Sequence, residues 1–442
     1  MTIRFDQSLP ELVRIIAEHV SDEVFSTSVF LRDATGYLSV VIDAQLSEEG
    51  LAELTEKVNA GIGAYAREDS AVRDLSGPGA ARLLEASDVA NVLVGGLTVR
   101  FVDRRMVGAD WLLAPAVAEN STRIAFASIK GGVGRSTALA VAAVHLSRRG
   151  LRVLAIDLDL EAPGIGSMLL SEAGLPTYGS LDYLVENGIS QIDDEFLSNV
   201  IGKSSLGGGG GQVTVVPAFG RATLECPAGG LAKIARAYLE DVTPDGTISL
   251  TAQVQEMVKR LEDAGSYDVT LIDARAGLHE TTAAVLLGLS AETLLFGIDE
   301  PQTFYGYRLL MAHLAERNPP GLDAWRDRLQ FVQAKAPIRP AEQLDAASRF
   351  RDLLEVFNPP AAEVANVPDL TAEDFDVEWS DDNPDTDLIV GDDVPVIPIL
   401  DDPRYRGFDP ARQPDLLTTE SFSATFGSLL EWVERIAIGS EG

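Results

Sequence analysis

The chain has 442 residues, of which 46% are hydrophobic and 23% charged, a composition typical of a soluble globular protein. This length exceeds what one hydrophobic core usually organises, so we expect two domains, or one large domain with appendages. The formal net charge of −33 disfavours binding to DNA or to anionic lipid, because both select clustered Lys and Arg.

The sequence also bears on where the protein works. No apolar run approaches the roughly 20 residues that a membrane-spanning helix needs. The first residues carry acids early and lack a small-residue cleavage site, so we expect no secretory signal. Cys226 is the only cysteine, which excludes an internal disulfide and fits a reducing compartment. We therefore expect a cytoplasmic protein.

Residues 1–120 are predicted to form a small α+β domain, to which the sequence assigns no role. Helical spacing precedes two β-rich segments, and a polar-faced helix then leads to a further strand. In chain order these segments are 9–20, 24–33, 37–44, 46–66 and 97–115. We identify no catalytic constellation among them.

From Thr122 onward, strands and helices alternate. The predicted strands are 123–129, 151–160, 213–219, 267–277, 291–299, 329–335 and 394–400, and the predicted helices 136–150, 251–265, 304–317 and 421–437. This rhythm predicts a second domain over residues 121–442, an α/β fold with a mostly parallel sheet flanked by helices.

Two segments interrupt the alternation. Gly207–Gly211 is a run of five glycines, which predicts a flexible loop tip. Between Glu363 and Asp402 there are fourteen Asp or Glu and no Lys or Arg, which predicts an acidic insertion near 361–393. Charge repulsion should keep the insertion extended, as a solvated surface segment or as a binding segment for a basic partner.

The stretch ASIKGGVGRSTALA, residues 127–140, has the context of a phosphate-binding loop. It follows an apolar strand and opens a helix, so that backbone N–H groups and the helix N-terminus converge on anionic oxygens. Ser136 stands where a hydroxyl ligates Mg²⁺. The common pattern G-x-x-x-x-G-K-[ST] is not matched literally, because Ile129 replaces its first glycine and Arg135 its lysine.

Three motifs in order, KGGVGRST, VLAIDLDLEAPG and DVTLIDARAG, resemble those of the deviant-loop P-loop ATPases of the ParA/MinD type. The loop is similar to that of a bacterial subgroup that carries the KGGVGR variant. The resemblance covers roughly residues 122–440. It implies a P-loop NTPase fold, ATP and Mg²⁺ as cofactors, slow ATP hydrolysis and an ATP-dependent homodimer.

The resemblance also implies roles for individual residues. Lys130 matches the signature lysine that reaches the partner's phosphates across the dimer, and Arg135 takes the place of the loop lysine. Asp159 matches the aspartate that positions the attacking water, which completes the implied catalytic set. Gly277 lies where the loop that senses hydrolysis turns. The implied metal-binding residues are Ser136, Asp157 and Asp273, and the implied phosphate-binding residues are Lys130, Gly131, Gly132, Val133, Gly134, Arg135, Ser136 and Thr137.

Arg135 leaves two outcomes open. Arginine binds phosphate oxygens bidentately, whereas lysine is a compact point charge, so the loop must be spaced differently around an arginine. The outcome is either slow ATP hydrolysis or tight nucleotide binding with little turnover. The presence of Lys130 and the three aspartates favours hydrolysis. A cation at a helix N-terminus is disfavoured unless an anion occupies the site, so we predict that Arg135 contacts a phosphate. The segment with Gln333 and Lys335 lacks Asn-Lys-x-Asp, which favours adenine over guanine.

Two classes of function follow. The first is a Mg²⁺-dependent ATPase switch whose ATP-bound dimer controls a protein partner. The second is a nucleotide-loaded scaffold or sensor with vestigial hydrolysis. We expect neither DNA partitioning nor membrane cycling, because the chain is strongly acidic and its C-terminal segment, EWVERIAIGSEG, is not a basic amphipathic tail.

Overall fold

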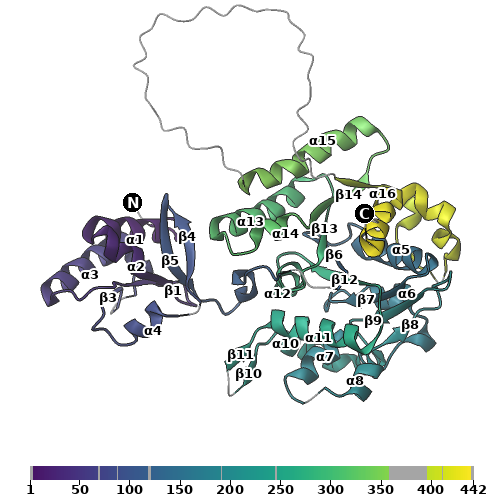
Figure 1. Ribbon diagram of the computed structural model, residues 1–442, viewed down its shortest axis with the longest axis horizontal. Coiled ribbons are helices and arrows are strands. Elements are labelled where there is room, and N and C mark those ends of the chain that lie inside the picture. Colours follow the sequence, from purple (N-terminus) through teal and green to yellow (C-terminus); the bar gives the residue numbers. More distant parts are fainter. Residues whose placement is uncertain are drawn as a thin grey trace, which may run out of the picture.

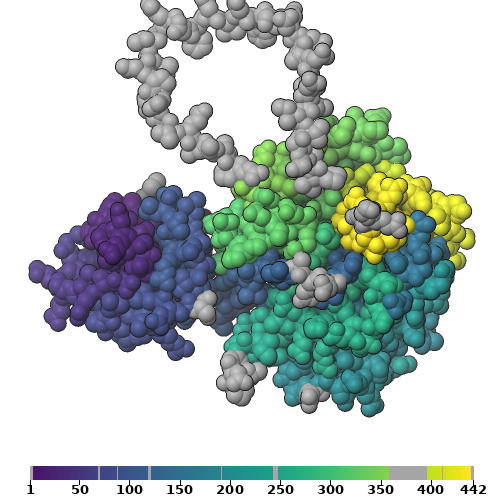
Figure 2. Space-filling model, viewed as in Figure 1, coloured from purple at the N-terminus to yellow at the C-terminus, as the bar shows by residue number. Residues whose placement is uncertain are grey.

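The computed structural model describes residues 3–67, 70–86, 88–117, 121–190, 192–243, 246–357, 396–410 and 412–439. The acidic insertion predicted near 361–393 lies outside these residues. Figure 1 shows the sheet of the N-terminal part apart from the largest sheet, and Figure 2 shows the N-terminal part as a lobe at one side of the larger α/β body. In the described part of the chain, no helix is both long and apolar enough to cross a membrane.

The N-terminal lobe is a five-stranded sheet in the order β3-β2-β1-β5-β4. Helices α1 and α3 pack on one face through Leu12, Ile16 and Val58, and the short helix α4 covers part of the other face through Leu83. The elements are α1 (Phe5–His19), α2 (Asp22–Thr27), β1 (Val29–Arg32), β2 (Leu38–Val41), α3 (Glu48–Ile62), β3 (Val72–Arg73), α4 (Ala80–Leu84), β4 (Ala90–Val94) and β5 (Leu97–Asp103). The domain boundary near residue 120 stays a prediction.

One predicted strand of this lobe begins later than expected. Residues 24–27 belong to helix α2, and strand β1 starts only at Val29. The Ser21 hydroxyl accepts a hydrogen bond from the Val24 N–H, and Asp22 and Glu23 occupy the first helical turn. A capping serine followed by acids stabilises a helix start, and this local signal outweighs the β propensity of the valine and phenylalanine that follow.

The larger sheet has eight strands in the order β15-β14-β13-β6-β12-β7-β9-β8. All neighbouring strands are parallel except β8 and β9, which confirms the predicted α/β class with a mostly parallel sheet. The strands are β6 (Arg123–Ser128), β7 (Arg152–Asp157), β8 (Gly202–Lys203), β9 (Gln212–Val216), β12 (Val269–Ala276), β13 (Glu292–Gly297), β14 (Leu329–Ala336) and β15 (Ile397–Leu400). A separate hairpin joins β10 (Asp241–Thr243) and β11 (Gly246–Ile248).

Helices cover both faces of this sheet (Figure 1). In β6, Ile124 and Phe126 face the core beneath α5 and α16, whereas Ala125 and Ala127 face the core beneath α11 and α13. Burial on both faces explains the nearly continuous apolar runs of the strands. The helices are α5 (Arg135–Arg148), α6 (Ile165–Leu169), α7 (Ser180–Asn187), α8 (Asp194–Asn199), α9 (Arg221–Glu225), α10 (Gly230–Ala237), α11 (Leu250–Ala264), α12 (Glu280–Ala283), α13 (Pro301–Arg317), α14 (Leu322–Arg326), α15 (Pro340–Arg351) and α16 (Thr419–Ile438).

The glycine run 207–211, for which the sequence predicts a flexible loop tip, packs closely against the end of α5. A Cβ on Gly209 would lie 2.1 Å from the Arg148 carbonyl oxygen, and one on Gly211 would lie 2.3 Å from that of Ser147. Gly209 also has φ +67°. The run is therefore glycine-rich because it passes close to the end of α5, a reason that composition alone does not reveal.

Candidate functional site

Three neighbouring strands bring the predicted site residues together at one edge of the larger sheet. Strands β6, β12 and β7 lie side by side, and Asp273 of β12 pairs in register with Asp157 of β7 and with Phe126 of β6. The carboxyl ends of parallel strands meet at the same edge, so the loop after β6 and both aspartates share one locality.

The loop after β6 is shaped to receive an anion. Gly132 and Gly134 have φ +74° and +91°, values that side-chain-bearing residues rarely adopt. A Cβ built on Gly131, Gly132 or Gly134 would meet no protein atom within 4 Å. Helix α5 begins at Arg135 with no side-chain cap and no acid in its first turn. Its free N–H groups and the open glycine backbone together make a phosphate-sized cradle.

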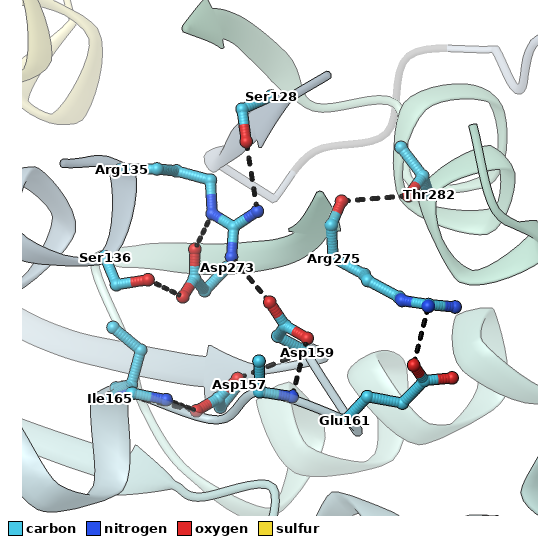
Figure 3. A network of polar contacts seen from close by, with 12 residues as sticks. Ser128, Arg135, Ser136, Asp157, Asp159, Glu161, Ile165, Asp273, Arg275 and Thr282 are labelled. Carbon is cyan, nitrogen blue, oxygen red and sulfur yellow. Dashed lines mark hydrogen bonds and ion pairs between the residues drawn. The ribbon is translucent and has the colours of Figure 1, made fainter. Parts of the chain in front are cut away.

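Arg135 points into the protein, where it joins two of the predicted acids (Figure 3). Its Nε donates to Oδ1 of Asp273 at 2.5 Å, and its Nη2 donates to Oδ2 of Asp159 at 3.0 Å. A third contact links Nη1 to the Ser128 hydroxyl at 3.3 Å. Arg135 is only 6% exposed. Three of the five guanidinium N–H groups thus have partners within the protein.

This cluster brings three buried acids together around one guanidinium. Asp157, Asp159 and Asp273 are all buried, and Arg135 is the cation that contacts two of them. Burial opposes the charge of Arg135, but Asp273 and Asp159 outweigh it and raise the pKa of Arg135. Burial and the neighbouring Asp273 raise the pKa of Asp157 to about 8, and burial raises that of Asp273 although Arg135 and Ser136 oppose it. A further cation close to these acids would lower the pKa values of Asp157 and Asp273 and favour their charged forms.

Asp157 organises the loop that follows β7. Its Oδ1 accepts the Asp159 N–H at 3.0 Å, and its Oδ2 accepts the N–H groups of Gly164 and Ile165, each at 3.0 Å (Figure 3). Both carboxylate oxygens therefore already have backbone donors. The predicted metal role of Asp157 stays a prediction, and the structure adds a second role, the fixing of the loop that carries Asp159.

Ser136 and Asp273 have the chemistry that Mg²⁺ requires. The Ser136 hydroxyl donates to Oδ2 of Asp273 at 2.6 Å. Mg²⁺ is bound in proteins through one or two oxygen side chains together with the phosphates of a nucleotide. Among the described residues, no group of three or more His, Cys, Asp or Glu is placed to hold a metal by itself. The oxygen atoms of Ser136 and Asp273 fit a magnesium ion that also binds nucleotide phosphates.

Lys130 lies apart from the acidic cluster. Its Nζ donates to Oε2 of Glu300 at 2.8 Å, and the two side chains are 37% and 45% exposed. Glu300 directly precedes α13, so this pair joins the phosphate-binding loop to the start of that helix. An exposed pair of this kind is weak, and its lysine can exchange partners readily.

A cavity of about 410 Å³ adjoins the loop. Gly132, Gly134 and Thr137 line one side, and Lys335 and the segment 399–408 line the other. Lys335 has φ +52°, a strained conformation that tends to occur at functional positions. Gln333 is buried and does not line the cavity.

Sequence reasoning missed the segment 399–408 as part of the site. The available signal was its position, because Asp401 and Asp402 follow directly after strand β15, whose carboxyl end meets the same sheet edge as that of β6.

A second ion pair links the loops after β7 and β12. Oε2 of Glu161 accepts from Nη2 of Arg275 at 2.6 Å (Figure 3), and Oε1 accepts from the Tyr238 hydroxyl at 3.2 Å. Gly277 turns the second loop with φ +93°, and its N–H donates to the carbonyl of Ser128. The two loops that carry the predicted catalytic and sensing residues are thus joined by side chains as well as through the sheet.

Comparison with known proteins now adds a family. Residues 124–274 match the family described as CobQ/CobB/MinD/ParA nucleotide binding domain. The match confirms the resemblance to the ParA/MinD type, while the KGGVGR subgroup stays a prediction. Among the curated proteins, none matches this chain.

Several solved structures are similar to this chain. The cell division ATPase MinD of Pyrococcus furiosus is 20% identical, with TM-score 0.42, 72% of this chain and 99% of that chain covered. MinD of Pyrococcus horikoshii OT3, complexed with Mg-ADP, is 19% identical, with TM-score 0.42 and coverage of 72% and 97%. A ParA family ATPase of Chlorobium tepidum TLS is 18% identical, with TM-score 0.41 and coverage of 73% and 99%.

Proposed function

We propose that this chain, whose residues 124–274 match the CobQ/CobB/MinD/ParA nucleotide-binding family, is a Mg²⁺-dependent ATPase switch that dimerises on ATP and controls a protein partner. One observation carries the proposal. A glycine cradle at the start of α5 lies beside Ser136 and Asp273, in a cluster of three buried acids that one guanidinium contacts. Phosphate oxygens fit the cradle, and a divalent cation would favour the charged form of the acids.

In this proposal each residue has a defined task. The N–H groups of the loop bind the β-phosphate, and Ser136 with Asp273 would hold Mg²⁺, which when bound supplies charge compensation for the phosphates. Asp159, held in place by Arg135 and by the Ala162 N–H, orients the attacking water. Lys130 leaves Glu300 and contacts the phosphates of the partner subunit. Phosphoryl transfer needs mostly such positioning and charge stabilisation.

A second candidate, a nucleotide-loaded scaffold with vestigial hydrolysis, is favoured by the same guanidinium. Arg135 forms ion pairs with both Asp159 and Asp273 in this structure. The carboxylates that would orient water and hold the metal in the first candidate are therefore each already paired with a cation. If nucleotide binding leaves these pairs intact, binding without turnover follows. The two candidates thus differ in whether Asp159 takes part in chemistry.

Phosphate release from ATP separates the two candidates. We would compare the wild type with Lys130→Ala and Asp159→Ala, with and without Mg²⁺. Lys259→Ala and Asp263→Ala serve as matched controls, because these side chains form an exposed pair, each 65% exposed, on α11. If the protein is an ATPase, we expect Mg²⁺-dependent phosphate release in the wild type and in both controls, and none in the two test variants. Bound nucleotide with no release in any protein would establish the scaffold instead.

Dimerisation is tested by light scattering with Mg²⁺ and a non-hydrolysable ATP analogue. We expect a two-fold symmetric dimer in the wild type and a monomer in Lys130→Ala. A wild-type monomer at saturating nucleotide would restrict Lys130 to a contact within its own chain.

A further inference from the structure

The N-terminal lobe contains a large hollow that the proposed nucleotide chemistry does not use. Its volume is about 1190 Å³, and its lining is mainly polar. It lies on the sheet face that α4 covers only in part, with Leu31 of β1 and Leu83 of α4 among its lining. Glu240 and Thr247, from the larger body, complete its wall.

Four arginines converge on this hollow. They come from a loop, a strand, a helix and the end of another strand, and they are Arg67, Arg73, Arg82 and Arg104. Three acids, Glu85, Asp88 and Glu240, also line the hollow. The arginines still outnumber these acids, whereas the whole chain has 35 Lys and Arg against 68 Asp and Glu. Bringing like charges together is unfavourable unless acids or a bound anion compensate them.

Acidic side chains compensate two of these arginines. Nη1 of Arg67 lies 2.8 Å from Oδ2 of Asp33, and Nε of Arg104 lies 3.6 Å from Oδ2 of Asp88. The Arg104–Asp88 pair is more than half exposed on both sides, so it is weak and can rearrange.

The other two arginines have no acidic partner in the described part of the chain. Nη1 of Arg73 reaches the Pro78 carbonyl only at 3.5 Å, and its Nε is buried with no hydrogen-bond partner among the described atoms. Burial, together with the nearby charges of Arg67 and Arg104, lowers the pKa of Arg73. Arg82 is exposed on α4. A buried donor without a partner is unfavourable, so a ligand that pairs with the Arg73 guanidinium would gain affinity from that contact.

We propose that this hollow binds a small anionic ligand that carries two or more phosphate groups, with Arg73 and Arg82 as its main contacts. Guanidinium groups bind phosphate oxygens bidentately, and two uncompensated guanidiniums match two phosphates better than one. The volume is ample for a drug-sized ligand and far exceeds a single phosphate. The hydroxyls of Ser70 and Thr247 add donors beside the arginines.

Inorganic tripolyphosphate is the probe, titrated calorimetrically into the full chain. The wild type is compared with Arg73→Gln/Arg82→Gln and with the matched control Arg221→Gln/Arg236→Gln, which removes the same charge from exposed positions on α9 and α10. The loop after β6 can also take up tripolyphosphate, but it is unchanged in all three proteins. We expect the test variant to bind one equivalent less than both the wild type and the control. Coincident isotherms for the three proteins would refute the site.

Two further arms make the test robust. Because Arg73 is partly buried and its replacement can affect folding, Arg82→Gln alone is titrated as well, and we expect affinity at this site to fall at least 3-fold. Unchanged affinity in a folded Arg82→Gln protein would overturn the proposal. Orthophosphate, titrated into the wild type, should bind this site at least 10-fold more weakly than tripolyphosphate. Equal affinity would exclude a ligand with several phosphates.

Discussion

The Nε of Arg135 lies 2.5 Å from Oδ1 of Asp273, and both residues are buried at the centre of the site. An arginine at a helix N-terminus is favourable only beside an anion, and the carboxylates of Asp273 and Asp159 lie at that position. The guanidinium therefore pairs with one acid of β12 and with one acid of the loop after β7. A phosphate contact for Arg135 stays a prediction.

Removing Arg135 should destabilise the fold. Arg135→Ala leaves the buried carboxylates of Asp159 and Asp273 without their cation, and we expect the free energy of unfolding to fall by about 3–5 kcal/mol. Arg152→Ala is the matched control, because it breaks an Arg–Asp pair between β7 and the residue before β12 that is 51% and 32% exposed. There we expect a loss under about 1 kcal/mol. Urea unfolding measures the stability of both variants. Equal losses of unfolding free energy would contradict the idea that Arg135 stabilises the fold by pairing with buried carboxylates.

Arg135 should also affect nucleotide affinity. At temperatures where Arg135→Ala stays folded, we expect ATP to bind roughly 10- to 150-fold more weakly, the range for charge-assisted hydrogen bonds. Arg135→Lys should bind ATP detectably but with altered turnover, because an ammonium cannot reach oxygens spaced for a guanidinium. Calorimetric titration and phosphate release provide the readouts. Wild-type affinity in Arg135→Ala would show that the arginine serves the carboxylates alone.

The Glu161–Arg275 pair should influence turnover more than stability. The pair is 40% and 23% exposed, so we expect Glu161→Gln or Arg275→Gln to cost under about 1 kcal/mol in unfolding. Because the pair joins the loops that carry Asp159 and Gly277, either change should alter the rate of phosphate release with little effect on KM. The double variant should resemble each single one in a double-mutant cycle. Additive rate effects would mean that the two residues act separately.

The lowered pKa of Asp402 predicts how the stability of the fold depends on pH. Its carboxylate accepts from Arg404 at 2.6 Å and from the Thr425 hydroxyl at 2.9 Å, and the hydrogen bonds from Arg404, the largest cause, lower its pKa to about 2. A carboxyl group with a lower pKa in the folded than in the unfolded protein stabilises the fold at pH values above its unfolded pKa, which is near 3.8. This contribution to stability is lost as the pH falls toward 2.

The corresponding experiment compares the wild type with Asp402→Asn. At pH 7 we expect Asp402→Asn to be about 0.5–1.5 kcal/mol less stable in urea unfolding, and the difference should shrink below about pH 4. Asp263→Asn, in an exposed helical pair, should show no such trend. A difference for Asp402→Asn that grows as pH falls would have the wrong sign for this mechanism.

The sequence by itself determined the local parts of this protein. An apolar run buried on both faces makes β6, and glycines at 132 and 134 permit the left-handed turns that lead into α5. Asp157 and Asp273 follow or close apolar strands, so their place at the carboxyl edge of the sheet followed from the alternation of strands and helices alone.

Only the tertiary structure decided which side chains meet. Arg135 contacts Asp273, 138 positions away, because β6, β12 and β7 are neighbours in the sheet. The order of the strands in the sheet cannot be read from the sequence. The hollow lined by Arg67 and Arg104 likewise joins elements that no motif connects. The glycine run 207–211 is a further example. Its sequence predicts a flexible loop, whereas in the structure it passes close to α5. Backbone preferences act over a few residues, whereas charge pairing and close packing depend on contacts between residues distant in the chain.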